Sequence, residues 1–132
     1  MKVVDSAGWL EFFADGPLAG AYAVHISNLA EILTPVIVVY EVYRLLKRER
    51  GDEEALIAVA QLAKTQVVPV TVTLALTAAD LGLEHGLAMA DSLVYATARS
   101  MGAELITSDA DFATLPGVTY LEKSKPGPAR LD

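Results

Sequence analysis

The sequence contains no cysteine among its 132 residues. Disulfides, thiolate nucleophiles and zinc or iron–sulfur sites with thiolate ligands are therefore excluded. Histidine is also scarce, because only His25 and His85 are present, and they are too scattered to build an imidazole metal site. Oxygen ligands remain, and carboxylates suit the hard cations Mg²⁺ and Mn²⁺.

Positive charge is sparse as well. The chain has 10 lysines and arginines against 17 acidic residues, which gives a formal charge of −7. This charge argues against binding of nucleic acid by general electrostatics, because phosphate contacts need basic side chains. It does not exclude a nuclease, since bound metal ions would cancel part of the acidic charge. The basic side chains gather within residues 44–50 and 123–130.

No apolar run is long enough to span a membrane. The longest charge-free stretch covers residues 65–79, is shorter than the ~20 residues that a spanning helix requires, and contains Pro69 and four threonines. Asp5 lies where a signal peptide would need its apolar core, so we expect a cytoplasmic protein. The length fits one domain, expected at residues 1–122 and followed by a tail at residues 123–132.

Short apolar or β-branched runs alternate with stretches of helical periodicity. The expected strands cover residues 1–4, 32–33, 67–72, 103–107 and 119–121, and the expected helices cover residues 6–14, 18–29, 35–50, 52–64, 74–85 and 91–101. This alternation predicts an α/β fold, a three-layer α/β/α sandwich around a mostly parallel sheet. Ligand sites in such folds lie beyond the carboxyl ends of the strands.

Local signals also predict where helices begin and end. Thr34 is expected to cap the helix that starts at Pro35, since a threonine hydroxyl can accept a backbone N–H and proline suits the first helical position. Gly51 and Gly86 are expected to end their helices, because glycine adopts the left-handed conformation at little cost.

Two of the acidic residues that could bind metal are Asp5 and Glu41. Asp5 ends an apolar strand, where an ionised carboxylate must find a cation, a donor or water, although it could also cap the helix that begins near Ala7. Glu41 lies two turns inside its helix, on a polar stripe with Arg44 and Arg48. The alternative for Glu41 is a solvated side chain that pairs weakly with Arg44.

The other two candidates are Asp91 and Asp109. Asp91 stands at a predicted helix start, where a capping role is the alternative explanation, but its neighbours are apolar. Asp109 follows a predicted strand in a segment that supplies two hydroxyls and two carboxylates, residues 107–111. An ordinary turn with Asx capping is the alternative there. An EF-hand is excluded, because its glycine and distal glutamate are missing.

Four stretches carry these acids: Val3-Val4-Asp5-Ser6-Ala7-Gly8-Trp9-Leu10-Glu11, Tyr40-Glu41-Val42, Ala90-Asp91-Ser92-Leu93-Val94-Tyr95-Ala96-Thr97-Ala98 and Ile106-Thr107-Ser108-Asp109-Ala110-Asp111-Phe112. Together they closely resemble, in order and over nearly the whole chain, the motif blocks of PIN-domain ribonucleases, specifically the VapC-type toxins. The resemblance implies that four acids form a catalytic, metal-binding site: Asp5, Glu41, Asp91 and Asp109. It also implies auxiliary roles for the hydroxyls of Ser6 and Thr107, while Asp111 matches a position that is acidic in only some members.

The resemblance further implies an Mg²⁺- or Mn²⁺-dependent endoribonuclease toxin, a homodimer, and a VapB-type antitoxin that blocks the acidic site. Hydrolysis of a phosphodiester by one or two metal ions explains so dense an acidic cluster. We assign Asp5 and Asp91 to the principal ion and give Glu41 and Asp109 orienting roles or a second ion. Because like charges repel, at least one carboxyl should have a raised pKa without metal.

Two questions stay open at this point. Three basic residues are candidates for guiding RNA, although a solvated helical face is the preferred explanation for them: Arg44, Lys47 and Arg48. The alternatives to a nuclease are a catalytically silent PIN fold used for binding and a phosphoacceptor receiver domain. The receiver fits badly, because Asp5 is followed by Ser6 instead of a second acid and Val70 has no acid nearby.

Overall fold

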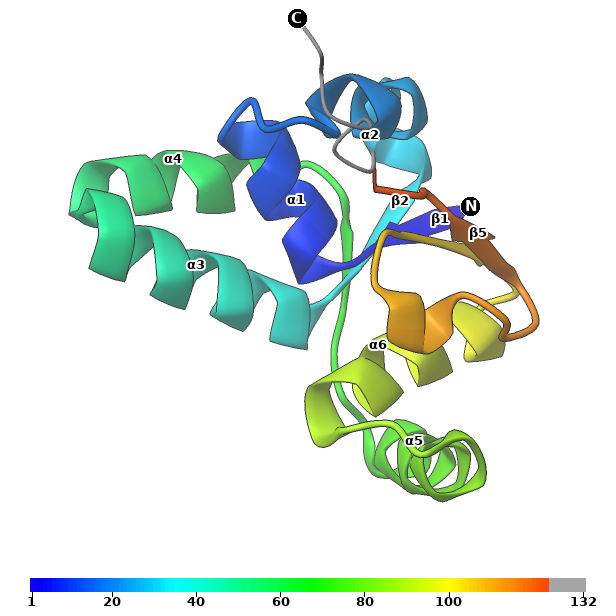
Figure 1. Cartoon of the computed structure of the whole chain (residues 1–132). Coiled ribbons are helices and arrows are strands. Elements are labelled where there is room, and N and C mark those ends of the chain that lie inside the picture. The colour runs from blue at the N-terminus through cyan, green and yellow to red at the C-terminus, as the bar shows by residue number, and fades with distance from the viewer. Residues whose placement is uncertain (124–132) are drawn as a thin grey trace, which may run out of the picture.

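Five parallel strands form one sheet at the centre of the protein, in the order β3-β2-β1-β4-β5. The computed structural model describes residues 1–123 (Figure 1), so most of the expected tail lies outside the described residues. The strands are β1 (Lys2–Val4), β2 (Ile32–Pro35), β3 (Gln66–Val68), β4 (Glu104–Thr107) and β5 (Val118–Tyr120). Every neighbouring pair is parallel, which confirms the predicted sheet.

Helices cover both faces of this sheet (Figure 1). Helices α1 and α2 lie on one side, whereas α6, backed by α5, lies on the other, and α3 and α4 form a pair beside α1. The helices are α1 (Ser6–Phe13), α2 (Ala19–Ile26), α3 (Val36–Arg50), α4 (Asp52–Leu62), α5 (Val72–His85) and α6 (Met89–Ser100), and two short 3₁₀ helices are η1 (Leu29–Glu31) and η2 (Ala110–Phe112). The predicted three-layer α/β/α sandwich is therefore confirmed.

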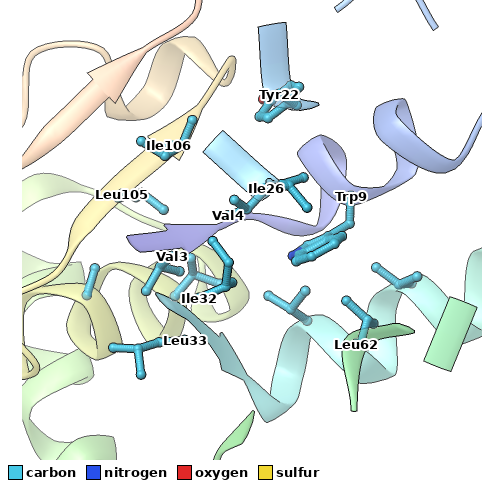
Figure 2. Packing of buried hydrophobic residues seen from close by; sticks show 14 of the residues in the cluster. Val3, Val4, Trp9, Tyr22, Ile26, Ile32, Leu33, Leu62, Leu105 and Ile106 are labelled. Carbon is cyan, nitrogen blue, oxygen red and sulfur yellow. The ribbon is translucent and has the colours of Figure 1, made fainter. Parts of the chain in front are cut away.

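The core lies where the central strands meet these helices. Val3 and Val4 point to opposite faces of β1 and are both fully buried, as expected for a central strand covered on two sides. Figure 2 shows Trp9 on the side of α1 that faces α3 and Leu62. Its ring is fully buried, and it stacks on Phe13 with 5.7 Å between the ring centroids. None of the helices in the described part of the chain has the length and apolar character that crossing a bilayer requires.

The predicted cap at Thr34 is wrong. Strand β2 continues through Thr34 and Pro35, and α3 begins at Val36 without a side-chain cap. The Thr34 hydroxyl instead forms a buried hydrogen bond of 2.5 Å with the hydroxyl of Thr65. The predicted helix ends are confirmed, because α3 ends just before Gly51 and α5 just before Gly86. Gly86 has the expected left-handed conformation (φ +68°), whereas Gly51 has a positive φ of +92° but an extended ψ of 175°. Neither φ angle is comfortable for other residues.

The strand predicted at residues 67–72 is also too long, since β3 ends at Val68. Pro69 cannot donate a ladder hydrogen bond, and the hydroxyl of Thr71 accepts the backbone N–H of Leu74 at 3.1 Å. This cap starts α5 at Val72, two residues earlier than expected. The β-branched residues after β3 therefore belong to the cap and the helix.

Candidate active site

The sheet places Asp5 and Thr107 side by side. Strands β1 and β4 are parallel neighbours in which Val4 lies opposite Ile106, so the next residues, Asp5 and Thr107, leave the sheet together at its carboxyl edge. Two residues later the same edge carries Asp109. Residues separated by about a hundred positions in the sequence therefore meet at one end of the sheet, as expected for ligand sites in open parallel sheets.

Asp5 is held by two hydrogen bonds. Its side chain is 6% exposed; Oδ1 accepts the backbone N–H of Gly8 at 2.9 Å, and Oδ2 accepts the hydroxyl of Thr107 at 2.5 Å. The capping role considered for Asp5 is thus confirmed, for the helix that starts at Ser6. Burial raises the pKa of Asp5, against the effect of these hydrogen bonds, and the charges of Asp109 and Glu41 raise it further.

Thr107 links Asp5 to Asp109. Its hydroxyl oxygen accepts the backbone N–H of Asp109 at 3.0 Å, while its hydroxyl hydrogen is donated to Asp5. Asp109 Oδ1 in turn accepts the backbone N–H of Asp111 at 2.9 Å and caps η2. The Asx turn expected in this segment is therefore present, and it leaves Asp109 Oδ2 without a bond inside the turn.

Three carboxylates approach one another closely. Asp91, Asp109 and Asp111 each offer an oxygen atom, and these atoms lie within 4.8 Å of one another. Asp111 occupies a position that is acidic in only some members of the family that the sequence resembles. Its carboxylate thus lies with those of two predicted ligands, Asp91 and Asp109. Asp5 and Glu41 lie outside this group of three but close enough for their charges to raise the pKa of Asp91.

Asp91 is not a helix cap. Helix α6 begins at Met89, two residues earlier than predicted, and Ala88 occupies the capping position without a side-chain hydrogen bond. The carboxylate of Asp91 therefore stands in the first turn, where the helix dipole favours negative charge. Burial, followed by the charges of the surrounding acids, raises its pKa to about 6. This agrees with the expectation that crowded carboxylates would have a raised pKa.

Glu41 projects from α3 and is half-buried. Its charge raises the pKa of both Asp5 and Asp91. Among residues 1–123 no ion pair joins Glu41 to Arg44, so the weak helical pair considered as an alternative is absent there. Glu41 also lines a surface hollow of about 230 Å³ between α1 and α3, together with the auxiliary residue Ser6.

The three basic candidates separate in the structure. Arg44 and Arg48 line the hollow beside Glu41. Lys47 instead donates to the hydroxyl of Tyr43 at 3.3 Å and pairs with Asp52 at 3.5 Å, where α3 meets α4. These contacts stabilise the cationic form and raise the pKa of Lys47.

Tyr22 is a residue of the site that sequence reasoning missed. It is fully buried in α2 and donates its hydroxyl to Ser108 Oγ at 2.9 Å. Burial raises the pKa of Tyr22 to about 12, and the charge of Asp5 contributes in the same direction. The side chain thus supports the segment that carries Asp109. Its sequence context gave no signal, because α2 has the composition of an ordinary apolar helix.

The donor set suits a hard divalent cation. Every ligand atom in the group is a carboxylate oxygen, and one oxygen from each of the three side chains lies within 4.8 Å of the others. Burial raises the pKa of Asp91, and the negative charges of Asp109 and Asp111 raise it further. Mg²⁺ and Mn²⁺ prefer oxygen ligands of this kind and would relieve the repulsion.

The profile of the PIN domain matches residues 2–118 of the chain. No curated protein sequence gives a significant match.

Solved structures of low sequence identity share the fold. A toxin–antitoxin complex from Klebsiella pneumoniae is 23% identical over 90% of this chain and 96% of that one, with a TM-score of 0.75. VapC20 from Mycobacterium tuberculosis, described as a toxin that cleaves the sarcin–ricin loop, is 23% identical over 89% and 97% of the two chains, also with a TM-score of 0.75. VapBC2 from Rickettsia felis, bound to promoter DNA, is 16% identical over 91% and 96%, with a TM-score of 0.72.

Proposed function

The chain belongs to the PIN domain family, and we propose that it is a metal-dependent endoribonuclease, the VapC-type toxin of a toxin–antitoxin pair. The observation that carries this proposal is the meeting of Asp91, Asp109 and Asp111, whose oxygens lie within 4.8 Å of one another beside the buried Asp5. The repulsion between these carboxylates destabilises the fold, so a role in folding alone does not explain why they lie together. VapC20, which shares the fold, is described as a toxin that cleaves the sarcin–ricin loop.

Mg²⁺ or Mn²⁺ is the cofactor that these carboxylates fit. When bound, it supplies positive charge to the phosphoryl group in the transition state and lowers the pKa of the attacking water. Asp5 and Asp91 are assigned to the principal ion, and Glu41 and Asp109 to orientation of ligands or to a second ion. Asp111 is added as a further ligand, because its oxygen lies with those of Asp91 and Asp109.

The chain's own residues fix where these charges stand. Thr107 and the N–H of Gly8 hold both oxygens of Asp5, so the carboxylate cannot rotate away from the cluster. Glu41 projects from α3 and lines the hollow together with Ser6. The site is therefore ordered before substrate arrives, which lowers the cost of aligning the scissile phosphate.

RNA, a cognate VapB-type antitoxin and a second copy of the chain are the proposed partners. Several solved relatives are complexes with antitoxin, which supports an antitoxin here. A homodimer contact and an antitoxin would each cover exposed apolar side chains, and two places offer them. One surrounds an apolar hollow of about 600 Å³ between α5 and α6 and includes Leu83 and Met89, and the other includes Leu56 and Ile57 on α4.

The test is cleavage of labelled RNA by purified protein, in Mn²⁺, in Mg²⁺ and in EDTA. Wild-type protein should cleave only with metal. Asp91→Asn keeps the size of the side chain but removes the charge, and it should reduce cleavage by more than the roughly 100-fold that loss of a ligand's supporting partner costs. Undiminished cleavage by Asp91→Asn, or cleavage by the wild-type protein in EDTA, would contradict the proposal.

The match to the PIN domain excludes the receiver domain that was considered as an alternative. The alternative that is left is a catalytically silent PIN fold that only binds partners. Thermal unfolding with added Mn²⁺ separates the two possibilities. A functional site should be stabilised by about 2.7 kcal/mol when Mn²⁺ is at 100 times its Kd. A silent scaffold has no need of metal and should unfold at the same temperature with or without it.

A further inference from the structure

The hollow between α1 and α3 has a composition that the metal site does not explain. Figure 1 shows these two helices side by side, and the hollow of about 230 Å³ opens between them. One wall comes from α1 and the other from α3, and the residues that matter are Ser6, Leu10, Tyr40, Glu41, Arg44 and Arg48. It therefore combines an aromatic ring and two cations with one of the proposed catalytic acids.

The α3 wall is a single face of the helix. Tyr40, Arg44 and Arg48 are spaced four residues apart, so their side chains stand one above another. Tyr40 is 59% exposed, and its ring stacks on no other aromatic ring among residues 1–123. A large aromatic side chain in this position offers a flat surface to a ligand.

The two arginines are available to an anion. Arg44 has no carboxylate within 4.0 Å in the described part of the chain. Arg48 contacts Glu49 at 3.1 Å, but both side chains are more than half exposed, and such a pair contributes little. These cations stand out in a chain with a formal charge of −7, so the hollow is a place where a polyanion can approach the acidic cluster.

We propose that this hollow binds one unpaired nucleotide of the RNA substrate, with its base stacked on Tyr40 and its flanking phosphates contacted by Arg44 and Arg48. The inference rests on the proposed nuclease function and adds to it a binding site for one unpaired nucleotide. Unstacked bases bind aromatic side chains whatever their sequence, and arginines follow the backbone. Because the hollow is lined by Glu41 and by Ser6, the residue after Asp5, a nucleotide held there leaves its neighbouring phosphodiester on the side of the carboxylates.

Binding is measured first, by fluorescence anisotropy of a labelled single-stranded RNA in EDTA, where cleavage does not interfere. Tyr40→Leu should weaken binding roughly 5- to 100-fold, whereas Tyr40→Phe, which keeps the ring, should bind like wild type. Arg44→Ala should lower the slope of log K against log[salt] by about 0.7, the value for one phosphate contact to a single strand. Tyr40→Leu should leave that slope unchanged.

Arg50→Ala is the matched control. Arg50 lies on the same helix and carries the same charge, but it pairs with Glu54 at 3.5 Å and does not line the hollow. Its removal should leave the salt slope within error. An equal change of slope in Arg44→Ala and Arg50→Ala would show general electrostatics and overturn the proposal.

An abasic nucleotide tests the stacking directly. Wild-type protein should lose kcat/KM for cleavage in Mn²⁺ when the base next to the cleaved bond is removed. For Tyr40→Leu, removal of the same base should lower kcat/KM only slightly further, because the base and the ring act as a pair and the variant already lacks the ring. Additive losses would overturn the proposal. A wild-type protein that cleaves RNA while all hollow variants match it would remove the nucleotide site and leave the nuclease intact.

Other outcomes are equally decisive. If wild-type protein binds the RNA but cleaves none with Mn²⁺, the nuclease fails while the anisotropy series still tests the hollow. If the variants bind RNA like wild type but resist inhibition by antitoxin, the hollow belongs to the antitoxin and the proposal is wrong. Wild-type protein that binds no RNA, with or without Mn²⁺, contradicts it as well. Far-UV circular dichroism confirms that each variant is folded.

Discussion

Thr107 donates its hydroxyl to Asp5 Oδ2 at 2.5 Å across 102 positions of sequence. The same hydroxyl accepts the backbone N–H of Asp109 at 3.0 Å. Both residues of the pair are buried, so water does not compete for the bond. One side chain therefore fixes the distance between two of the proposed metal ligands, one after β1 and the other after β4.

Thr107→Val should damage both stability and cleavage. Valine has nearly the same shape but leaves Asp5 Oδ2 buried without this donor, which should cost about 1.5–3 kcal/mol of unfolding free energy. The hydrogen bond lowers the pKa of Asp5, so that pKa should rise and Mn²⁺ binding should weaken. Urea unfolding and Mn²⁺ titration measure the two effects. Thr107→Ser keeps the hydroxyl and should stay near wild type in metal binding; a loss equal to that of valine would refute the role of the hydroxyl.

The stability of the metal-free protein should fall as pH rises from about 4 to about 6. The pKa of Asp91 is raised from 3.8 to about 6 in the folded protein, so the folded state binds more protons than the unfolded state across this window. Unfolding free energy must then decrease with pH there and become level above it. The raised pKa of Asp5 acts in the same direction. Urea unfolding in EDTA measures this, and Asp91→Asn should show a smaller decrease. A wild-type curve that parallels the variant would disprove the shift.

Protons should compete with metal at the same carboxylates. Asp91 must lose its proton to act as a ligand, and its pKa is about 6. The increase in Tm produced by a fixed Mn²⁺ concentration should therefore be smaller at pH 5 than at pH 7.5. An increase that is independent of pH would mean that Mn²⁺ binds elsewhere.

Tyr22→Phe should weaken metal binding and cleavage by roughly 10-fold, in the range expected for a side chain that supports a ligand-bearing segment. The change removes the hydrogen bond to Ser108, next to Asp109. Tyr95→Phe is the control, because it also removes a tyrosine hydroxyl, one that donates to the carbonyl of Pro116 at 2.8 Å. Each variant should lose about 1 kcal/mol of stability. Equal loss of Mn²⁺ affinity in both variants would show that Tyr22 has no positioning role.

Gly8→Ala should destabilise the protein by about 1–3 kcal/mol. A Cβ atom at this position would lie 2.5 Å from Tyr22 Cε1 and 2.7 Å from Val4 Cγ1, too close for either to accommodate without a shift. Gly20→Ala, also in a helix, meets no heavy atom within 4 Å. It should stabilise by up to about 1 kcal/mol through helix propensity. Chemical denaturation compares the two, and a stabilised Gly8→Ala would show that the helix can move.

The fold could be predicted from local patterns. Apolar strands such as β1, alternating with helical periodicity, were sufficient to predict a parallel sheet between helices. Errors occurred where a side chain found a distant partner. Thr34 satisfies the local rule for a helix cap, yet its hydroxyl bonds to Thr65, which lies 31 positions away.

The site was predictable in part for the same reason. Asp5 and Asp109 could be placed at the sheet edge, because strand ends are encoded locally. Which oxygens lie together depends on how α6 and η2 pack, and this brought Asp111 to Asp91. Lys47 looked equivalent to Arg44 on the helix surface, but the turn into α4 gives it Asp52 as a partner.

The sequence by itself determined the succession of strands and helices along the chain and the acidic character of one sheet edge. The first follows from the spacing of hydrophobic residues, and the second from the type of residue that ends each strand. Tertiary structure alone decided that Thr107 joins Asp5 to Asp109, that Tyr22 supports their loop, and that Tyr40 faces a hollow beside Glu41. These relationships depend on contacts between segments far apart in the chain, and their direction is set by packing, which no local pattern records.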